Sequence, residues 1–167
     1  MKYDFDEIIG NAKKGRYKQL GSGSCRMVFD LGDGYVVKIA KDIRGTEQNQ
    51  NEYVIYKSHQ SVFFAEIADI SPDSKLLVMA KAKKIRNLST VYQFYNVHNI
   101  NSLLKLNNFY KDVNAYKLSR GDLIRPSSWG VVNNAPVLID YGLTHDMYMK
   151  YYRRNPFMKK WFAPIYY

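Results

Sequence analysis

Two aspartates of this sequence lie in turns on either side of an apolar run. Asp122 follows Gly121, and Asp140 ends the run PVLID and precedes Tyr141-Gly142, eighteen positions later. An aspartate in a turn can be a simple turn former, because its carboxylate accepts hydrogen bonds from nearby backbone N–H groups. A carboxylate at the end of a strand can also hold Mg²⁺ together with nucleotide phosphates. Neither turn decides between these two interpretations.

Lys38 is a third candidate, in the middle of the β-rich run YVVKIAK. Alternation along a strand places Lys38 on the face opposite Val37 and Ile39. A lysine on the inner face of a small sheet needs an anion to offset its desolvation. A phosphate could supply that charge, and so could Glu52 on the following helix, with Glu47 as the alternative. An exposed strand lysine is the other interpretation.

Gly21-Ser22-Gly23 is expected to form a turn between two strands. Glycine has no Cβ, so the backbone amides of such a turn can approach an anion and cover the phosphates of a nucleotide. A turn without any ligand explains the same residues.

The first half of the chain has the pattern of a small antiparallel sheet. A short helix and a basic lead-in are expected over residues 1–18. Asp-Gly in Gly32-Asp33-Gly34 supplies the positive φ angles of a hairpin between strands 25–31 and 35–40. A helix capped at Thr46 is predicted to run to about residue 58. Two more strands, in FFAEIADIS and KLLVMAK, are expected around a turn at Pro72-Asp73.

The second half predicts one main helix, a hairpin and a tail. Apolar residues three or four apart favour a single helix over residues 101–118. The runs GVV and PVLID, joined by Asn133-Asn134, indicate a hairpin whose second strand ends at Asp140. The last 25 residues are aromatic and basic and are expected to be helical up to Pro156.

The composition is that of a globular protein with one compact core or two small lobes. The chain has 167 residues, of which 46% are hydrophobic. We expect neither a signal peptide nor a membrane-spanning run of about 18 apolar residues, and we therefore predict a cytoplasmic location. Cys25, the one cysteine, fits a reducing compartment and a packing role. The net charge of +10 favours polyanionic partners, whether nucleotide phosphates, nucleic acid or acidic protein surfaces.

The order of these features resembles the protein kinase-like fold over about residues 17–142. LGSGSCRMVF resembles the glycine-rich loop, with Arg26 in place of its third glycine, and VVKIAK resembles the lysine strand, with Glu52 as the helix partner of Lys38. KLLVMAKAKKI, which contains Met79, stands where the family has its last N-lobe strand and the hinge that binds adenine. RGDLIRPSSWG resembles the short catalytic loop of bacterial and phage kinase-like proteins, and LIDYGL resembles Asp-Phe-Gly.

The resemblance implies an α+β fold and a single kinase-like domain over residues 1–167. Its N-lobe, about 1–82, would hold the antiparallel sheet and one helix, and its reduced, mostly helical C-lobe would span about 83–167. The implied activity is ATP- and Mg²⁺-dependent transfer of a phosphoryl group to a serine or threonine of a protein, or of the chain itself. The implied site residues are Lys38, Glu52 and Asp122 for catalysis; Gly21, Ser22, Gly23, Lys38 and Met79 for ATP; and Asp140 and Ser127 for the metal.

The sequence also departs from the family. Arg120 replaces the usual histidine, and the metal-binding asparagine is replaced by Ser127, or by Ser128 if the loop has one extra residue. Only 25 residues follow Gly142, too few for a usual C-lobe, so the chain is similar to compact kinase-like proteins such as the RIO type. The tail could bind substrate or close the C-lobe core. A pseudokinase that acts through a protein partner, or a basic nucleic-acid-binding protein, are the alternative functions.

Overall fold

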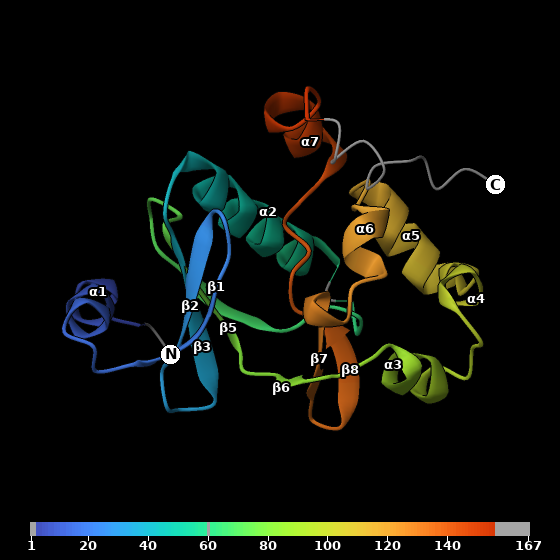
Figure 1. The fold of residues 1–167 in the computed structure, drawn as a ribbon, viewed down its shortest axis with the longest axis horizontal. Helices are drawn as coiled ribbons and strands as arrows, with labels where there is room; N and C mark the ends of the chain where they lie inside the picture. Colours follow the sequence, from blue (N-terminus) through green and yellow to red (C-terminus); the bar gives the residue numbers. More distant parts are fainter. Residues whose placement is uncertain (1–2, 60, 156–167) are drawn as a thin grey trace. The chain divides into compact units, whose positions relative to one another are not determined.

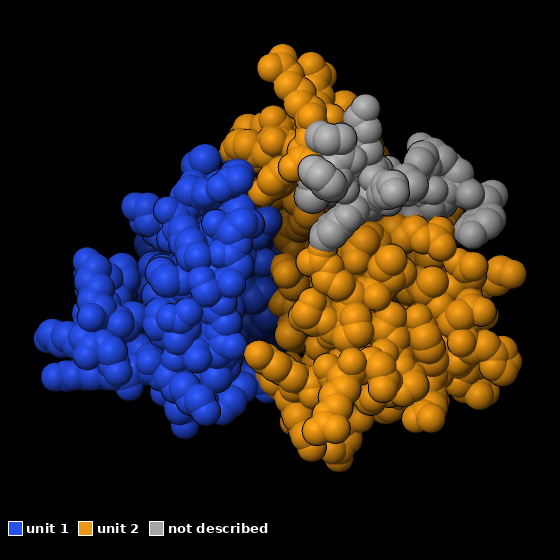
Figure 2. Space-filling model, viewed as in Figure 1, with its two compact units in different colours: residues 1–56, 66–81 blue, residues 57–65, 82–167 orange. Residues whose placement is uncertain are grey.

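The computed structural model describes residues 3–59 and 61–155. It is an α+β structure in which the chain forms two compact units. The first unit comprises residues 1–56 and 66–81, and the second comprises residues 57–65 and 82–167 (Figure 2).

The first unit contains a five-stranded antiparallel sheet with the strand order β1-β2-β3-β5-β4 (Figure 1). The predicted hairpin at Gly32-Asp33-Gly34 is confirmed, and both glycines have positive φ angles. The predicted turn at Pro72-Asp73 is also confirmed, because the Ser74 N–H donates to the Ser71 carbonyl at 2.8 Å. The strands are β1 (Lys18–Ser22), β2 (Arg26–Asp30), β3 (Tyr35–Ala40), β4 (Ile67–Ile70) and β5 (Leu76–Ala80).

The two faces of this sheet have different partners. Helix α1 (Phe5–Lys13), capped by Asp4, packs Ile8 against Phe29, Val37, Leu76 and Val78. The other face carries Lys38 and its Cα partners Val28 and Leu77, because residues paired across antiparallel strands point to the same side. Helix α2 (Ile43–His59) contacts that second face through polar side chains. The alternation predicted for Lys38 is therefore confirmed.

The expected start of α2 at Thr46 is wrong, because the helix begins at Ile43. Asp42 accepts hydrogen bonds from the Arg44 N–H at 2.9 Å and the Gly45 N–H at 3.2 Å, which satisfies backbone donors of the first turn. The hydrogen bond from the Arg44 side chain is the largest factor holding the pKa of Asp42 below its usual value. Asp42 thus provides the capping role that the sequence pattern assigned to Thr46.

Gly45 is required where α2 meets the start of β2. A Cβ there would lie 2.2 Å from the Cys25 backbone oxygen and 3.1 Å from the Ala40 Cα. We expect Gly45→Ala to lower the free energy of unfolding by roughly 1–3 kcal/mol, because backbone atoms must shift. Gly10→Ala, inside α1 with nothing within 4 Å of the added Cβ, should raise it by roughly 0.5–1 kcal/mol. Urea denaturation measures both, and equal effects of the two substitutions would contradict the close contact at Gly45.

The second unit combines a small sheet with short helices. Its strands follow the order β6-β7-β8, and Asn133 and Asn134 form the predicted hairpin turn with φ angles of 49° and 64°. The core is aromatic: the ring centroids of Phe63 and Phe109 lie 4.8 Å apart, and those of Phe109 and Trp129 lie 6.0 Å apart. The elements are β6 (Lys83–Lys84), β7 (Trp129–Val132), β8 (Ala135–Leu138), α3 (Ser89–Phe94), α4 (Ile100–Leu104), α5 (Asn107–Ala115), α6 (Arg120–Leu123), a 3₁₀ turn (Pro126–Ser128) and α7 (His145–Tyr151).

The single helix predicted over residues 101–118 is wrong. The chain forms α4 and α5 with a break at Leu106, whose φ and ψ of −66° and 116° are extended. Asn107 and Asn108 follow the break, and asparagine disfavours a helix interior because its side chain competes for the backbone. Strand β8 ends at Leu138, two residues before the predicted end at Asp140. The expected helix up to Pro156 is limited to α7, and residues 156–167 lie outside the described residues.

None of the helices in residues 3–59 and 61–155 combines the length and apolar character that crossing a membrane requires.

Candidate functional site

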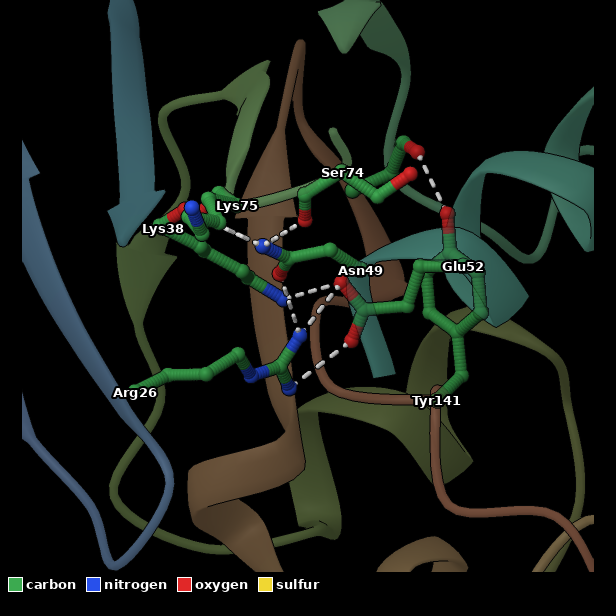
Figure 3. Close-up of polar contacts among 8 residues, drawn as sticks. Arg26, Lys38, Asn49, Glu52, Ser74, Lys75 and Tyr141 are labelled. Carbon is green, nitrogen blue, oxygen red and sulfur yellow. Dashed lines mark hydrogen bonds and ion pairs between the residues drawn. The ribbon is translucent and has the colours of Figure 1, made fainter. Parts of the chain in front are cut away.

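The first unit buries an ion pair between β3 and α2. The Lys38 Nζ lies 2.7 Å from the Glu52 Oε2, and the two residues are 5% and 0% exposed (Figure 3). The structure therefore pairs Lys38 with Glu52, the partner preferred from the sequence. Because Glu52 lies on α2 and Lys38 in the central strand of the sheet, the pair fixes the helix to this face.

Arg26 holds the same carboxylate. Its two terminal nitrogens lie 3.0 Å from Glu52 Oε2 and 3.0 Å from Oε1, so the guanidinium contacts both oxygens. Arg26 is 7% exposed. A planar guanidinium fits a carboxylate in this two-point geometry, which a lysine ammonium cannot reproduce. Sequence reasoning treated Arg26 only as a replacement for a glycine and missed this contact.

Asn49 completes the cluster and was also missed. Its Oδ1 accepts from Arg26 at 3.2 Å, and its Nδ2 donates to the carbonyls of Ser74 at 3.0 Å and Lys75 at 3.1 Å (Figure 3). Asn49 is fully buried and lies three residues before Glu52, on the same side of α2. The spacing of three residues between Asn49 and Glu52 was the sequence signal that could have identified Asn49 as part of the site. We call Arg26, Lys38, Asn49 and Glu52 the polar cluster.

The charges of the polar cluster keep Glu52 ionised. Desolvation by burial, the largest single influence, would by itself raise the pKa of Glu52. The attraction of Arg26 and of Lys38, together with their hydrogen bonds, outweighs that effect and lowers the pKa below the ordinary value of 4.5. The carboxylate is therefore a stable anchor for two cations at neutral pH.

A turn between two strands is present as predicted, but it lies further along the chain: Gly21 and Ser22 belong to β1 and pair with Val28 and Met27, and the loop of the β1–β2 hairpin spans residues 23–25. The Gly23 N–H donates to the Arg26 carbonyl at 2.9 Å. The Lys41 Nζ donates to the Ser22 Oγ at 2.8 Å and the Gly23 carbonyl at 2.6 Å. A phosphate-binding role for this loop stays a prediction.

Met79 lies in β5 on the same face of the sheet as Lys38. Its Cα partners are Val36 in β3 and Ile67 in β4, and its side chain is buried. The structure thus brings Met79 to the sheet face that carries the polar cluster. Its predicted contact with a nucleotide is untested.

In the second unit, the backbone segments that carry Asp122 and Asp140 lie side by side. The Ser119 N–H donates to the Leu143 carbonyl at 3.3 Å, and the Ile139 N–H donates to the Ser128 carbonyl at 2.8 Å. These two hydrogen bonds lie on either side of the two aspartates. The tertiary structure therefore joins two turns that the sequence separates by eighteen positions.

The environments of the two aspartates differ. Asp122 lies in the short helix α6, not in an open turn as expected, and it is buried. Its Oδ1 lies 4.0 Å from a terminal nitrogen of Arg125. Asp140 follows β8 and is half-buried. The two carboxylates are thus presented by different backbone conformations on adjacent segments.

The two serines proposed in place of the metal-binding asparagine also differ. Ser127 is exposed, whereas Ser128 is buried and its Oγ has no hydrogen-bond partner in the described part of the chain. The Ser128 carbonyl holds Ile139, the residue before Asp140. Within residues 3–59 and 61–155, no group of three His, Cys, Asp or Glu side chains is arranged to hold a metal ion.

Tyr141, the residue after Asp140, is fixed by the loop that follows α2. Its hydroxyl donates to the Ala65 carbonyl at 3.2 Å, and its ring centroid lies 4.6 Å from that of Phe64. Phe64 in turn forms a parallel bridge with Leu138. The backbone at Asp140 and Tyr141 is therefore held in two ways, by the contacts of the Tyr141 side chain and by the bridge at the end of β8.

Comparisons of this chain with models of protein families and with curated proteins give no match.

Proposed function

We propose that this chain is an ATP- and Mg²⁺-dependent phosphotransferase of the protein kinase-like type, with a serine or threonine hydroxyl of a protein as acceptor. The observation that carries the proposal is the buried pair of Lys38 and Glu52, 2.7 Å apart. Burying two charges costs on the order of several kcal/mol of desolvation per ion, and a buried group whose pKa is shifted by a specific charge partner is a candidate for a functional site.

The arrangement around this pair supports the proposal. A glycine-containing hairpin between β1 and β2 precedes the lysine strand β3, and the helix with Glu52 connects β3 to β4 and β5. In the second unit, a hairpin separates the segments of Asp122 and Asp140, and hydrogen bonds bring those segments together. The kinase-like resemblance requires these elements in this order.

The residues present fit magnesium through oxygen donors. The Asp140 carboxylate and the Ser128 hydroxyl are both ligands of the class that Mg²⁺ prefers. The buried Ser128 Oγ has no hydrogen-bond partner among the described residues, and a bound ion would supply the contact that this polar atom lacks. We therefore assign the serine role to Ser128 in place of Ser127. When bound, the ion would neutralise charge on the nucleotide phosphates.

Each remaining residue has a role in this proposal. Lys38, oriented by Glu52, contacts the α and β phosphates. Asp122 orients the acceptor hydroxyl and accepts its proton, while the hydroxyl oxygen bonds to the γ phosphorus and the bond from that phosphorus to the ADP oxygen breaks. Gly21-Ser22-Gly23 covers the phosphates, and Met79 lies beside the adenine.

A nucleotide-binding module without transfer activity is the second candidate. One observation favours it: Arg26 stands in the third-glycine position with its guanidinium on Glu52. Both candidates bind a nucleotide, so binding and transfer must be measured separately.

Calorimetric titration with Mg-ATP, followed by transfer of labelled γ-phosphate, tests the proposal. The wild-type chain should bind one nucleotide, and Lys38→Met should weaken binding at least roughly tenfold, the equivalent of about 1.4 kcal/mol. Lys75→Met is the matched control, because Lys75 is an exposed lysine paired with Asp73 at 3.0 Å. Absence of binding to the wild type would refute both candidates, and binding without transfer would favour the module.

A further inference from the structure

Arg26 connects two features of the first unit, the carboxylate of Glu52 and the loop between β1 and β2. Its side chain contacts both carboxylate oxygens of Glu52, on α2. Its backbone carbonyl accepts the Gly23 N–H at 2.9 Å and so closes the loop between β1 and β2. One residue therefore belongs to the polar cluster and to the predicted phosphate loop.

The contact between Arg26 and Glu52 also sets the position of Lys38. Lys38 and Arg26 share the Glu52 Oε2, at 2.7 and 3.0 Å. Because Arg26 contacts both oxygens, it fixes the plane of the carboxylate, whereas a single ammonium contact leaves that plane free to turn. The Arg26 nitrogen that lies next to Glu52 Oε2 also donates to the Asn49 Oδ1, at 3.2 Å. The place that Lys38 can occupy thus depends on Arg26.

The loop is held at a second point nearby. The Lys41 N–H donates to the Cys25 carbonyl at 2.8 Å, and the same carbonyl leaves no room for a Cβ at Gly45 of α2. The residue before Arg26 is therefore packed against the helix that carries Glu52. Arg26 and Cys25 together tie this end of the loop to α2.

We propose that Arg26 is a positioning residue that couples the loop of residues 22–26 to Glu52 and, through Glu52, orients Lys38 for the phosphates of a nucleotide. The coupling follows from the contacts above, and its effect on phosphate binding rests on the proposed function. Lys38 contacts the ligand in this proposal, and Arg26 acts through it.

Binding of Mg-ATP and of adenosine to Arg26→Met and Arg26→Lys tests the effect on phosphate binding. Both variants should weaken Mg-ATP by roughly tenfold, the scale of coupling between residues in one network, and leave adenosine binding within about twofold. A general loosening of the fold would weaken both ligands equally and overturn the proposal. Wild-type affinity in Arg26→Lys would also overturn it, because it would assign the role to charge alone.

Amide hydrogen exchange tests the coupling without a nucleotide. In Arg26→Met, the amides of Gly23 and Lys41 should exchange about tenfold faster or more, while that of Val37, in the centre of the sheet, keeps its wild-type rate. Arg16→Met, which removes an exposed hydrogen bond to the Asn11 Oδ1, should leave all three rates unchanged.

The two measurements distinguish a failure of the proposed function from a failure of the role proposed for Arg26. If the wild type does not bind Mg-ATP, the proposed function fails, and exchange at Gly23 and Lys41 alone decides the coupling. If the wild type binds Mg-ATP but Arg26→Met leaves both its affinity and these exchange rates unchanged, the role of Arg26 is refuted and the proposed function stands.

Discussion

Replacing Glu52 by glutamine is expected to lower the free energy of unfolding by roughly 3–5 kcal/mol. The substitution keeps the shape of the side chain and removes the only negative charge of the polar cluster. Arg26 and Lys38, both nearly fully buried, then lie next to a neutral amide that cannot offset their desolvation. Urea or guanidinium denaturation followed by circular dichroism measures the change.

Two further variants show whether the effect belongs to the ion pair. Lys38→Met should cost less, roughly 1–2 kcal/mol, because Glu52 keeps both contacts with Arg26. Glu47→Gln makes the same substitution on the same helix, outside the polar cluster, and should lower the stability clearly less than Glu52→Gln, because Glu47 is only half-buried. Equal losses for Glu52→Gln and Glu47→Gln would contradict the geometry of the polar cluster.

The pH dependence of the Glu52→Gln effect has a definite sign. The pKa of Glu52 is lower in the folded chain than its ordinary value of 4.5, so its ionised form stabilises the fold. That contribution is complete above the unfolded pKa and is lost as the pH falls through the folded pKa. The stability difference between wild type and Glu52→Gln should therefore be constant near neutral pH and shrink below pH 4.5. A difference that grew on acidification would refute the assigned shift.

Replacing Asp140 by asparagine is expected to reduce Mg²⁺-dependent phosphoryl transfer by at least roughly a hundredfold. In the proposed function Asp140 supplies the one carboxylate ligand of the metal, and an amide oxygen carries no formal charge to offset the cation. The folded structure should persist, because Asp140 is only half-buried and Tyr141 keeps its hydrogen bond with the Ala65 carbonyl. Transfer of labelled γ-phosphate at saturating Mg-ATP gives the rate.

Asp146→Asn is the matched control for this loss. Asp146 lies six positions further on, in the first turn of α7, and its side chain is 90% exposed. Its rate should equal that of the wild type. Unchanged transfer in Asp140→Asn would remove Asp140 from the metal site, whereas equal losses in both variants would indicate a general effect of charge.

Local patterns in the sequence predicted the elements that surround the polar cluster. The run YVVKIAK alternates, so it places Lys38 opposite Val37 and Ile39, and the glycines at 32 and 34 supply the positive φ angles of the hairpin. Each of these features depends on residues close in sequence. Where a helix begins or ends depends on the competition between backbone and side-chain hydrogen bonds. For that reason the cap at Asp42 and the break at Leu106 were not predicted.

The buried polar side chains could not be predicted in the same way. The buried side of α2 consists of Gly45, Asn49, Glu52 and Ile55, so its hydrophobic pattern is too weak to identify the inner face. Asn49 and Arg26 are polar residue types that are mostly exposed in proteins. Their burial follows from the strands and the turn that cover them, which come from residues 23 to 26 positions away in the sequence.

The sequence by itself determined most of the strands, the hairpin turns at residues 32–34 and 133–134 and the sheet face that carries Lys38, and it indicated Glu52 as the preferred partner of that lysine. Only the tertiary structure decided that Arg26 and Asn49 join that pair, that Ser128 is buried while Ser127 is exposed, and that the segments of Asp122 and Asp140 lie side by side. The physical reason is the distance along the sequence between the residues that each feature depends on. Strand alternation and turn geometry arise from neighbouring residues, whereas burial and the pairing of polar groups depend on which distant segments pack together.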